Sequence, residues 1–244
     1  MRMRKKRHGD ERLSVLSAIA FKNAADLAKN PHDLFGNDRP LRLEIGCGKG
    51  GFIRGISKAE PDYNYIAIEK ISDVIVIAAE KYAEDRGLGH LDPHGGWAAP
   101  DGHVYEGGEV FDIPMNDRGN VRFAVADAAT LTELFPAGCF ESIYVNFCDP
   151  WDKKGYASRR LTHPDFLKKY TALLMDGGYL KFKTDNEKLF DYSVETIPAN
   201  GFEPVFVTRD LHASERAATN IVTEYEKNFS EKGVKINFME ARKK

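Results

Sequence analysis

The sequence predicts an α/β protein built on a doubly wound, mostly parallel β-sheet. Two observations carry this prediction. Short apolar runs rich in β-branched and aromatic residues alternate along the chain with longer runs of helical period. Each short run is also followed, within three residues, by a glycine or an acidic residue. In such folds ligands bind beyond the carboxyl ends of the strands, so these ends are where we look for chemistry.

Five apolar runs of four or five residues predict the buried strands. They are Leu41–Ile45, Tyr65–Ile68, Val121–Val125, Ile143–Phe147 and Tyr179–Phe182. After the second run, an apolar stripe over Val74–Tyr82 predicts a helix. Ser72 or Asp73 can cap its start, and Gly87 can end it.

Two further helices are expected after the fourth and fifth strands. Pro164–Leu174 has a proline in its first turn, preceded by Thr162 or His163 as a cap, and the pair Gly177–Gly178 follows its end. The other helix runs over Glu187–Ala199. Strands and helices in this order are typical of parallel sheets covered by helices.

Composition indicates an ordinary globular protein. With 244 residues, 42% hydrophobic and 30% charged, the chain is neither collagen-like, disordered nor a disulfide scaffold. The apolar stretch Leu13–Phe21 is too short to cross a bilayer, and Asp10 and Glu11 before it do not fit a signal peptide. Three cysteines without metal or redox spacing fit free thiols. We expect one cytoplasmic domain over residues 1–244, with a basic N-terminal extension at about 1–12 and no membrane segment.

An acidic, glycine-rich stretch at about 87–120 reads as an insertion. It holds six acidic residues and one arginine, a charge of −5, so the rest of the chain carries −2 − (−5) = +3. Eight glycines and three prolines predict a long loop, with a short hairpin around Val104 and Val110. Its histidines are expected to be solvated, and we predict no metal site.

The loop after the first strand contains closely spaced glycines. Gly46, Gly48 and Gly51 satisfy G-x-G-x-x-G, so a dinucleotide site is one possibility, with Glu69 binding a ribose. Glu44 favours a different ligand, because a carboxylate before the loop repels a pyrophosphate and attracts the ammonium of a methionine moiety. S-adenosylmethionine fits this charge better.

A third acid supports the same ligand. Asp127 closes the third strand and can accept a hydrogen bond from an adenine amino group. Each acid also has an ordinary interpretation: Glu44 as an exposed strand-end charge, Glu69 as a helix N-terminal acid and Asp127 as a turn former. Three acids at three successive strand ends around one glycine loop favour a cofactor site.

The loop after the fourth strand combines an acid, an aromatic residue and bases. Asp149 lies at its tip, followed by Pro150, Trp151 and Lys153, and Arg159 with Arg160 extends the basic character. Such a combination suits a nucleobase together with a phosphate.

Several motifs together closely resemble the bacterial tRNA (guanine-N7-)-methyltransferase family. They are Gly46-Cys-Gly-Lys-Gly, Asn146-Phe-Cys-Asp-Pro-Trp, Arg159-Arg-Leu, Phe182-Lys-Thr-Asp-Asn and Thr223-Glu-Tyr-Glu. The resemblance covers nearly the whole chain except about 87–120. It implies a class I, Rossmann-like methyltransferase fold with a mostly parallel seven-stranded sheet, S-adenosylmethionine as donor, and methylation of a guanine in the tRNA variable loop.

The resemblance also implies roles for individual residues. Cofactor contacts are expected at Glu44, Gly46, Gly48, Glu69, Asp127 and Asp149, with Asp149 also the catalytic acid. Substrate contacts are expected at Lys153, Arg159, Arg160, Asp185, Thr223, Glu224, Tyr225 and Glu226. Asp185, Glu224 or Glu226 could read the two-donor edge of guanine. Taken alone, the last four residues read as a capped helix start, and Lys183 reads as a solvated strand residue.

Two departures from the family pattern leave alternatives open. Asp152 stands where the family usually has proline, and Gly155–Ser158 replaces a basic stretch, which predicts weaker and less salt-dependent tRNA binding through this loop. The alternatives are a methyltransferase of small molecules or proteins, an NAD-dependent oxidoreductase, and a tRNA-binding module without catalysis. The sequence fits a monomer or a homodimer equally well.

Overall fold

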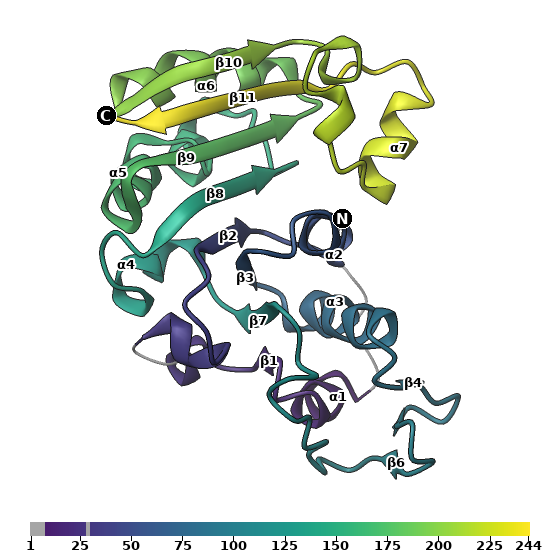
Figure 1. Ribbon diagram of the computed structural model, residues 1–244. Helices are drawn as coiled ribbons and strands as arrows, with labels where there is room; N and C mark the ends of the chain where they lie inside the picture. Colours follow the sequence, from purple (N-terminus) through teal and green to yellow (C-terminus); the bar gives the residue numbers. More distant parts are fainter. Residues whose placement is uncertain (1–7, 28–29) are drawn as a thin grey trace. The chain divides into compact units, whose positions relative to one another are not determined.

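The computed structural model describes residues 8–27 and 30–244 (Figure 1). The chain divides into two compact units. The first unit comprises residues 1–39 and 47–127, and the second unit comprises residues 40–46 and 128–244. Of the expected N-terminal extension, residues 1–7 lie outside the described part of the chain, and the rest begins helix α1 (Gly9–Val15).

Three parallel strands form the sheet of the first unit, in the order β1 (Ala20–Phe21), β7 (Val121–Val125) and β3 (Asn64–Glu69). The expected strands β3 and β7 are confirmed, whereas the two-residue β1 is too short to be read from a pattern. Strands β3 and β7 are buried almost along their full length, as expected for a parallel sheet covered by helices.

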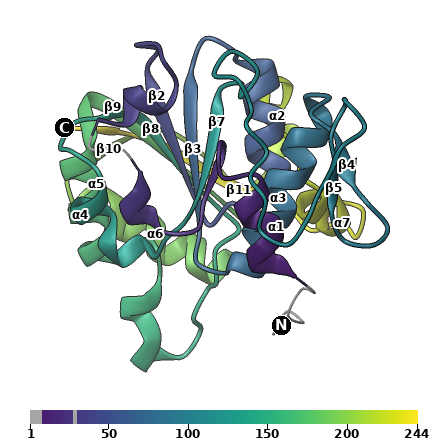
Figure 2. The same cartoon turned by 90° about the horizontal axis from the view of Figure 1, so that it is seen from below.

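Helices α2 (Gly51–Ala59) and α3 (Ser72–Asp85) belong to the first unit, where α3 packs against both α1 and β7 (Figure 2). Gly87 follows α3 with φ 70°, as its expected role as a terminator requires. The expected cap is wrong: Ser72 and Asp73 lie inside the first turn, and Ile71 precedes the helix without a side-chain cap. Glu69 Oε1 instead accepts the Ile71 N–H at 3.1 Å.

The stretch from Gly87 to Asn120 is more ordered than a loop. It holds an antiparallel three-stranded sheet of β4 (His90–Leu91), β5 (Trp97–Ala98) and β6 (Val104–Tyr105). The hairpin expected around Val104 and Val110 is therefore wrong, because Val104 pairs with Ala98 and Val110 is 56% exposed outside any strand. Two-residue strands are too short to show a periodic pattern.

Five strands form the sheet of the second unit. In sheet order they are β2 (Leu41–Ile45), β8 (Phe140–Asn146), β9 (Leu174–Thr184), β11 (Asn237–Lys243) and β10 (Phe202–Thr208). Strands β2, β8 and β9 are parallel, and β11 is antiparallel to both of its neighbours. The expected strands are thus confirmed, β8 and β9 being longer than their apolar runs.

The helices of the second unit include α5 (Pro164–Leu173) and α6 (Glu187–Ala199), which contact each other and β9 (Figures 1 and 2). Shorter elements are α4 (Leu131–Leu134), α7 (Glu224–Ser230) and the 3-10 turns η3 (Ala128–Thr130), η4 (Lys154–Arg159), η5 (Leu211–Ala213) and η6 (Ala217–Thr219). Two more 3-10 turns, η1 (Ala24–Asp26) and η2 (Pro31–Leu34), belong to the first unit.

The start of α5 is as expected and its end is not. His163 caps the helix by accepting the Asp165 N–H, and Pro164 opens it. The pair Gly177–Gly178, however, lies inside β9, which follows α5 directly. Gly178 is needed for close strand approach, because a Cβ there would lie 2.9 Å from the Glu141 carbonyl oxygen.

Within residues 8–27 and 30–244, no helix combines the length and the apolar character needed to cross a membrane.

Candidate active site

The glycine loop of the first unit turns sharply from β2 toward α2. Gly48 and Gly50 have φ values of 54° and 76°, a region that favours glycine. A Cβ on Gly48 would meet no atom within 4 Å, so backbone conformation rather than space requires glycine there. Cys47 N–H donates to the Ile68 carbonyl at 3.0 Å, which ties the loop to β3.

Glu69 and Asp127 lie at the carboxyl ends of two paired strands, β3 and β7. Glu69 Oε2 accepts the Gly48 N–H at 3.3 Å, so the second acid orders the glycine loop itself. Asp127 is 41% exposed at its side chain and forms a 2.7 Å ion pair with Lys70, a partner that no pattern in the sequence indicates. These two acids therefore share one edge of the first unit with Gly48.

Glu44 and Gly46 belong to the second unit, at the carboxyl end of β2. Glu44 is only 2% exposed, and its Oε1 accepts a hydrogen bond from Asn146 Nδ2 at 3.2 Å. Its interpretation as an exposed strand-end charge is therefore wrong. Gly46 follows β2 with φ 75°. A buried carboxylate needs a compensating cation or donors, which a ligand ammonium also supplies.

The loop after β8 contains two aromatic residues in a conformation that is costly for them. Phe147 and Trp151 have φ values of 52° and 46°. Hydrogen bonds hold both: Phe147 N–H donates to the Lys183 carbonyl at 2.8 Å, and Arg160 donates to the carbonyl of Trp151 at 3.2 Å. Between them Asp149 is exposed at the tip, where a substrate can reach it. Such strain is common at functional sites.

Cys148, next to Asp149, has the wrong chemistry for a nucleophile. Burial, followed by the neighbouring Asp149 carboxylate, raises the pKa of its thiol to about 12. The thiol is therefore protonated at neutral pH, and the thiolate is the reactive form.

The basic residues after this loop stack on aromatic rings. Arg159 Cζ lies 5.0 Å from the centre of the Trp151 ring and 4.7 Å from that of Tyr156. Arg160 also donates to the Pro150 carbonyl at 3.0 Å, and its Cζ lies 4.5 Å from the Tyr192 ring centre. Lys153, Arg159 and Tyr156 are exposed, so this segment presents both charge and aromatic surface.

The segment from Thr223 to Glu226 forms the capped helix start that its pattern indicates. Thr223 Oγ1 accepts the Glu226 N–H at 3.1 Å, and α7 begins at the exposed Glu224. The ring of Tyr225 lies 4.9 Å from that of Phe147, centre to centre. Tyr225 OH donates to Asp185 Oδ1 at 3.5 Å, so this segment and the end of β9 meet the loop of Asp149.

Glu226 itself is fully buried, and Lys183 is only 2% exposed. Lys183 Nζ lies 2.6 Å from Glu226 Oε2, while His212 Nε2 and Asn220 Nδ2 lie 2.7 and 2.6 Å from Glu226 Oε1. The interpretation of Lys183 as a solvated strand residue is therefore wrong. His212 and Asn220 were missed, and no spacing in the sequence marks them as partners of Glu226.

Among the described residues, no group of three or more His, Cys, Asp or Glu side chains is arranged to hold a metal ion.

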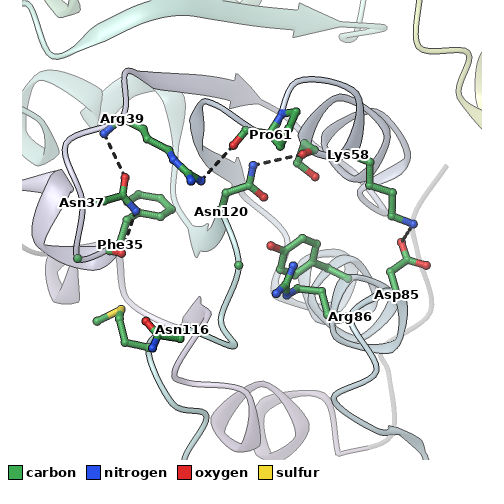
Figure 3. Close-up of a pocket in the computed structure, with 14 residues that line it drawn as sticks. Phe35, Asn37, Arg39, Lys58, Pro61, Asp85, Arg86, Asn116 and Asn120 are labelled. Carbon is green, nitrogen blue, oxygen red and sulfur yellow. Dashed lines mark hydrogen bonds and ion pairs between the residues drawn. The ribbon is translucent and has the colours of Figure 1, made fainter.

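The first unit also holds a cavity of about 570 Å³, which is lined by none of the candidate site residues (Figure 3). Its lining includes Pro61 and Asn120, which precede β3 and β7, so it opens at the amino ends of these strands. Arg39 donates to the Pro61 carbonyl at 3.1 Å, and Asn120 donates to the Tyr63 carbonyl at 3.0 Å. The chemistry expected of parallel strands lies at their opposite ends, so this cavity is not the candidate active site.

Comparison with known proteins gives the family. Residues 38–239 match a family model described as "Putative methyltransferase". A tRNA (guanine-N(7)-)-methyltransferase of Listeria monocytogenes serovar 1/2a is 40% identical, and the alignment covers 99% of this chain and 98% of that protein. The protein of the same name from Bacillus subtilis strain 168 is 39% identical, with 97% of this chain and 96% of that protein covered.

Solved structures confirm the predicted class I methyltransferase fold. The expected number of seven strands is wrong, because the described sheets of the two units hold three and five strands, including the two-residue β1. A structure described as an antibiotic-related methyltransferase aligns with a TM-score of 0.56 at 16% identity, covering 89% of this chain and 94% of that one. The 16S rRNA methyltransferase KamB aligns with a TM-score of 0.57 at 11% identity, covering 87% and 91%. These identities are low and show the fold alone, whereas the full-length relatives at about 40% identity are decisive: the chain belongs to the tRNA (guanine-N(7)-)-methyltransferase family.

Proposed function

We propose that this protein transfers a methyl group from S-adenosylmethionine to N7 of a guanine in the variable loop of tRNA, giving 7-methylguanosine. The observation that carries the proposal is the match, at 40% identity and over 99% of the chain, to a relative that bears the name of this activity. The presence of Asp149 and the Thr223–Glu226 segment agrees with it. We infer a cytoplasmic location, which the three free cysteines support.

The residues expected to contact the cofactor have the chemistry to bind S-adenosylmethionine. Glu44, buried at the end of β2, suits the methionine ammonium, and Gly46 lets the chain turn beside it. Gly48 likewise lets the backbone turn close to the cofactor. The Glu69 carboxylate accepts the N–H groups of Gly48 and Ile71, and its remaining lone pairs accept hydrogen bonds from the ribose hydroxyls. Asp127 accepts from the adenine amino group. The bound cofactor supplies an electrophilic methyl group on a sulfonium.

Transfer to N7 needs no general base. Guanine N7 carries an in-plane lone pair, which forms the new N–C bond as the S–C bond breaks and its electron pair stays on sulfur. The work of the protein is therefore to extract the base from its stack and to hold it in line. Asp149 contacts the cofactor, and its carboxylate stabilises the positive charge that develops on the purine.

The RNA is held by the residues around this centre. Asp185 or Glu224 reads the N1 and N2 hydrogens of guanine, and Thr223 and Tyr225 lie against the base. Lys153, Arg159 and Arg160 bind the phosphates. Arg160 is held in place by its hydrogen bonds to the carbonyls of Pro150 and Trp151, and Arg159 by its contact with the Trp151 ring.

The test is methyl transfer from labelled S-adenosylmethionine to total bacterial tRNA, followed by nucleoside analysis. We expect 7-methylguanosine from the wild-type protein and a loss of at least about 10²-fold for Asp149→Ala. Asp152→Ala is the matched control, because it removes an exposed acid from the same loop. Unchanged unfolding temperatures would show that both variants fold. Near-normal transfer by Asp149→Ala would remove the role given to Asp149, and another methylated nucleoside would overturn the substrate.

A further inference from the structure

Lys183, at the end of β9, is the centre of a buried polar cluster in the second unit. Its Nζ donates to Asn220 Oδ1 at 3.0 Å, to the Ile221 carbonyl at 3.1 Å and to Glu226 Oε2 at 2.6 Å. Burial lowers the pKa of this ammonium, and Glu226 opposes the change. These three hydrogen bonds tie both the stretch before α7 and the first turn of α7 to the sheet.

Glu226 uses both carboxylate oxygens inside this cluster. Oε2 faces Lys183, and Oε1 faces His212 and Asn220. Burial raises the pKa of Glu226, but these partners outweigh it and keep the pKa below its ordinary value. To reach a guanine, the carboxylate would have to leave a buried ammonium without its partner, which is strongly unfavourable.

The neighbouring Tyr225 points the other way. It is 45% exposed, and its ring lies 4.9 Å from that of Phe147 and 4.6 Å from that of Phe229, centre to centre. We call these three rings the aromatic wall. The hydroxyl of Tyr225 reaches Asp185, so the wall adjoins the acids assigned to the substrate.

Lys183 contacts both segments that contribute rings to this wall, the loop after β8 and the start of α7. Its carbonyl accepts the N–H of Phe147, whose ring centre lies 5.4 Å from Nζ. Through Glu226 the same residue holds the helix turn that carries Tyr225. The lysine is thus the link between the strained loop after β8 and the start of α7.

We propose that Lys183 is a positioning residue, which acts through Glu226 to hold the aromatic wall where the target guanine packs. The inference rests on the proposed function and assigns Glu226 to the support of the wall rather than to the base. Tyr225 is the residue that meets the guanine, because stacking against an aromatic ring binds an extruded base.

The experiment measures KM for tRNA, kcat and the affinity for S-adenosylmethionine in Lys183→Met, Glu226→Gln and the double variant. Each single change should raise KM for tRNA about tenfold, in line with the loss of one base-stacking contact, with the cofactor Kd within about twofold of wild type. KM for tRNA in the double variant should be no higher than in the single variant with the higher KM, since both substitutions break the same support.

Variants of the wall itself complete the test. Tyr225→Ala should raise KM for tRNA as Lys183→Met does, whereas Tyr225→Phe keeps the ring and should rescue most of the binding. Asn220→Ala removes one bond to each member of the buried pair and serves if Lys183→Met does not fold. It should shift KM in the same direction by a smaller factor.

The control is Arg42→Met, which breaks a 2.7 Å ion pair with Glu141 in the same unit, at the amino ends of β2 and β8. It should lower the unfolding temperature and leave KM for tRNA unchanged. Wild-type KM in a folded Lys183→Met or Asn220→Ala overturns the inference. Multiplicative effects in the double variant also overturn it, because Glu226 would then act on the base independently. A wild-type protein that forms no 7-methylguanosine refutes the proposed function and the inference with it.

Discussion

At the residue scale, the two aromatic residues with positive φ are the most unusual feature of the loop after β8. A non-glycine residue in this region costs of the order of 1–3 kcal/mol. Phe147 and Trp151 keep it because hydrogen bonds from the loop and from Arg160 fix their backbone. The strain fixes the direction of the chain on both sides of Asp149. Rigid placement of that carboxylate fits the catalytic role proposed for Asp149, because the proposed reaction depends on positioning.

Cys148 gives a residue-scale prediction. Because burial and Asp149 raise the pKa of its thiol to about 12, alkylation by iodoacetamide should be slow at pH 8 and should still be rising at pH 10. Mass spectrometry of the labelled peptide measures the rate, with a small free thiol as the reference. In urea the rate at pH 8 should approach that of the reference. Fast labelling of the folded protein at pH 8 would contradict the raised pKa.

The acids of the candidate site could be predicted from the sequence, whereas the buried Lys183–Glu226 pair could not, because it depends on a contact between distant residues. Glu44, Glu69 and Asp127 could be found because they follow apolar runs, and the structure places each at a strand end. The burial of Lys183 depends on which face of β9 it occupies and on Glu226, 43 residues away. No local pattern encodes such a pairing, and the alternation around Phe182 fits a solvated lysine equally well.

At the element scale, helices α2 and α3 are joined by one carboxylate, which predicts a pH-dependent stability (Figure 3). Hydrogen bonds from Arg54 and then Lys58 lower the pKa of Asp85 below 3.8. The stabilisation is therefore complete above the unfolded-state pKa and is lost as the pH falls through the folded-state pKa. Asp85→Asn should cost up to about 1 kcal/mol at pH 7, since the pair is partly exposed, and progressively less below pH 4.

Urea unfolding at pH 7, 5, 4 and 3 measures this difference. Asp176→Asn is the control, because Asp176 is fully exposed in its pair with Lys243 and its removal should change little at any pH. A cost of Asp85→Asn that stays constant down to pH 3 would show that the carboxylate does not stabilise the folded state through its charge.

Trp97 gives a second element-scale prediction, for the small sheet between Gly87 and Asn120. Its side chain is 3% exposed and its Nε1–H donates to the Leu88 carbonyl at 2.9 Å. Trp97→Ala should cost about 3–5 kcal/mol in urea unfolding, while Val110→Ala, at an exposed position, should stay within about 0.5 kcal/mol. Methyl transfer below the unfolding transition should survive in both. Loss of transfer in the folded Trp97→Ala would give the insertion a part in the reaction.

Element length decided how much of the fold could be predicted. The five buried strands and α6 have runs long enough to show their period, and α6 has the predicted bounds Glu187–Ala199. Strands β1, β4, β5 and β6 are two residues each and carry no period. Strand β10 alternates between exposed and half-buried positions over much of its length, so it lacks the apolar run of a central strand.

At the scale of the whole molecule, a binding experiment can distinguish S-adenosylmethionine from a dinucleotide, the two cofactor classes whose binding motifs include a glycine loop of this kind. G-x-G-x-x-G and Glu69 fit a dinucleotide as well, whereas the buried Glu44 opposes a pyrophosphate. A ligand that binds only the folded state stabilises it by about 2.7 kcal/mol at a hundred times its Kd. For a chain of this size that corresponds to a rise of about 5–10 °C in the unfolding temperature.

We therefore expect S-adenosylmethionine to raise the unfolding temperature by about this amount and NAD, at the same concentration, to leave it unchanged. Glu44→Gln removes the charge that attracts the methionine ammonium, so the rise should shrink in this variant relative to its own ligand-free value. Glu141→Gln is the matched control, an acid of the same unit at the amino end of β8, and should keep the full rise. A rise with NAD that Glu44→Gln enlarges would mean that the carboxylate repels a pyrophosphate at a dinucleotide site, and the assignment of the donor would fall.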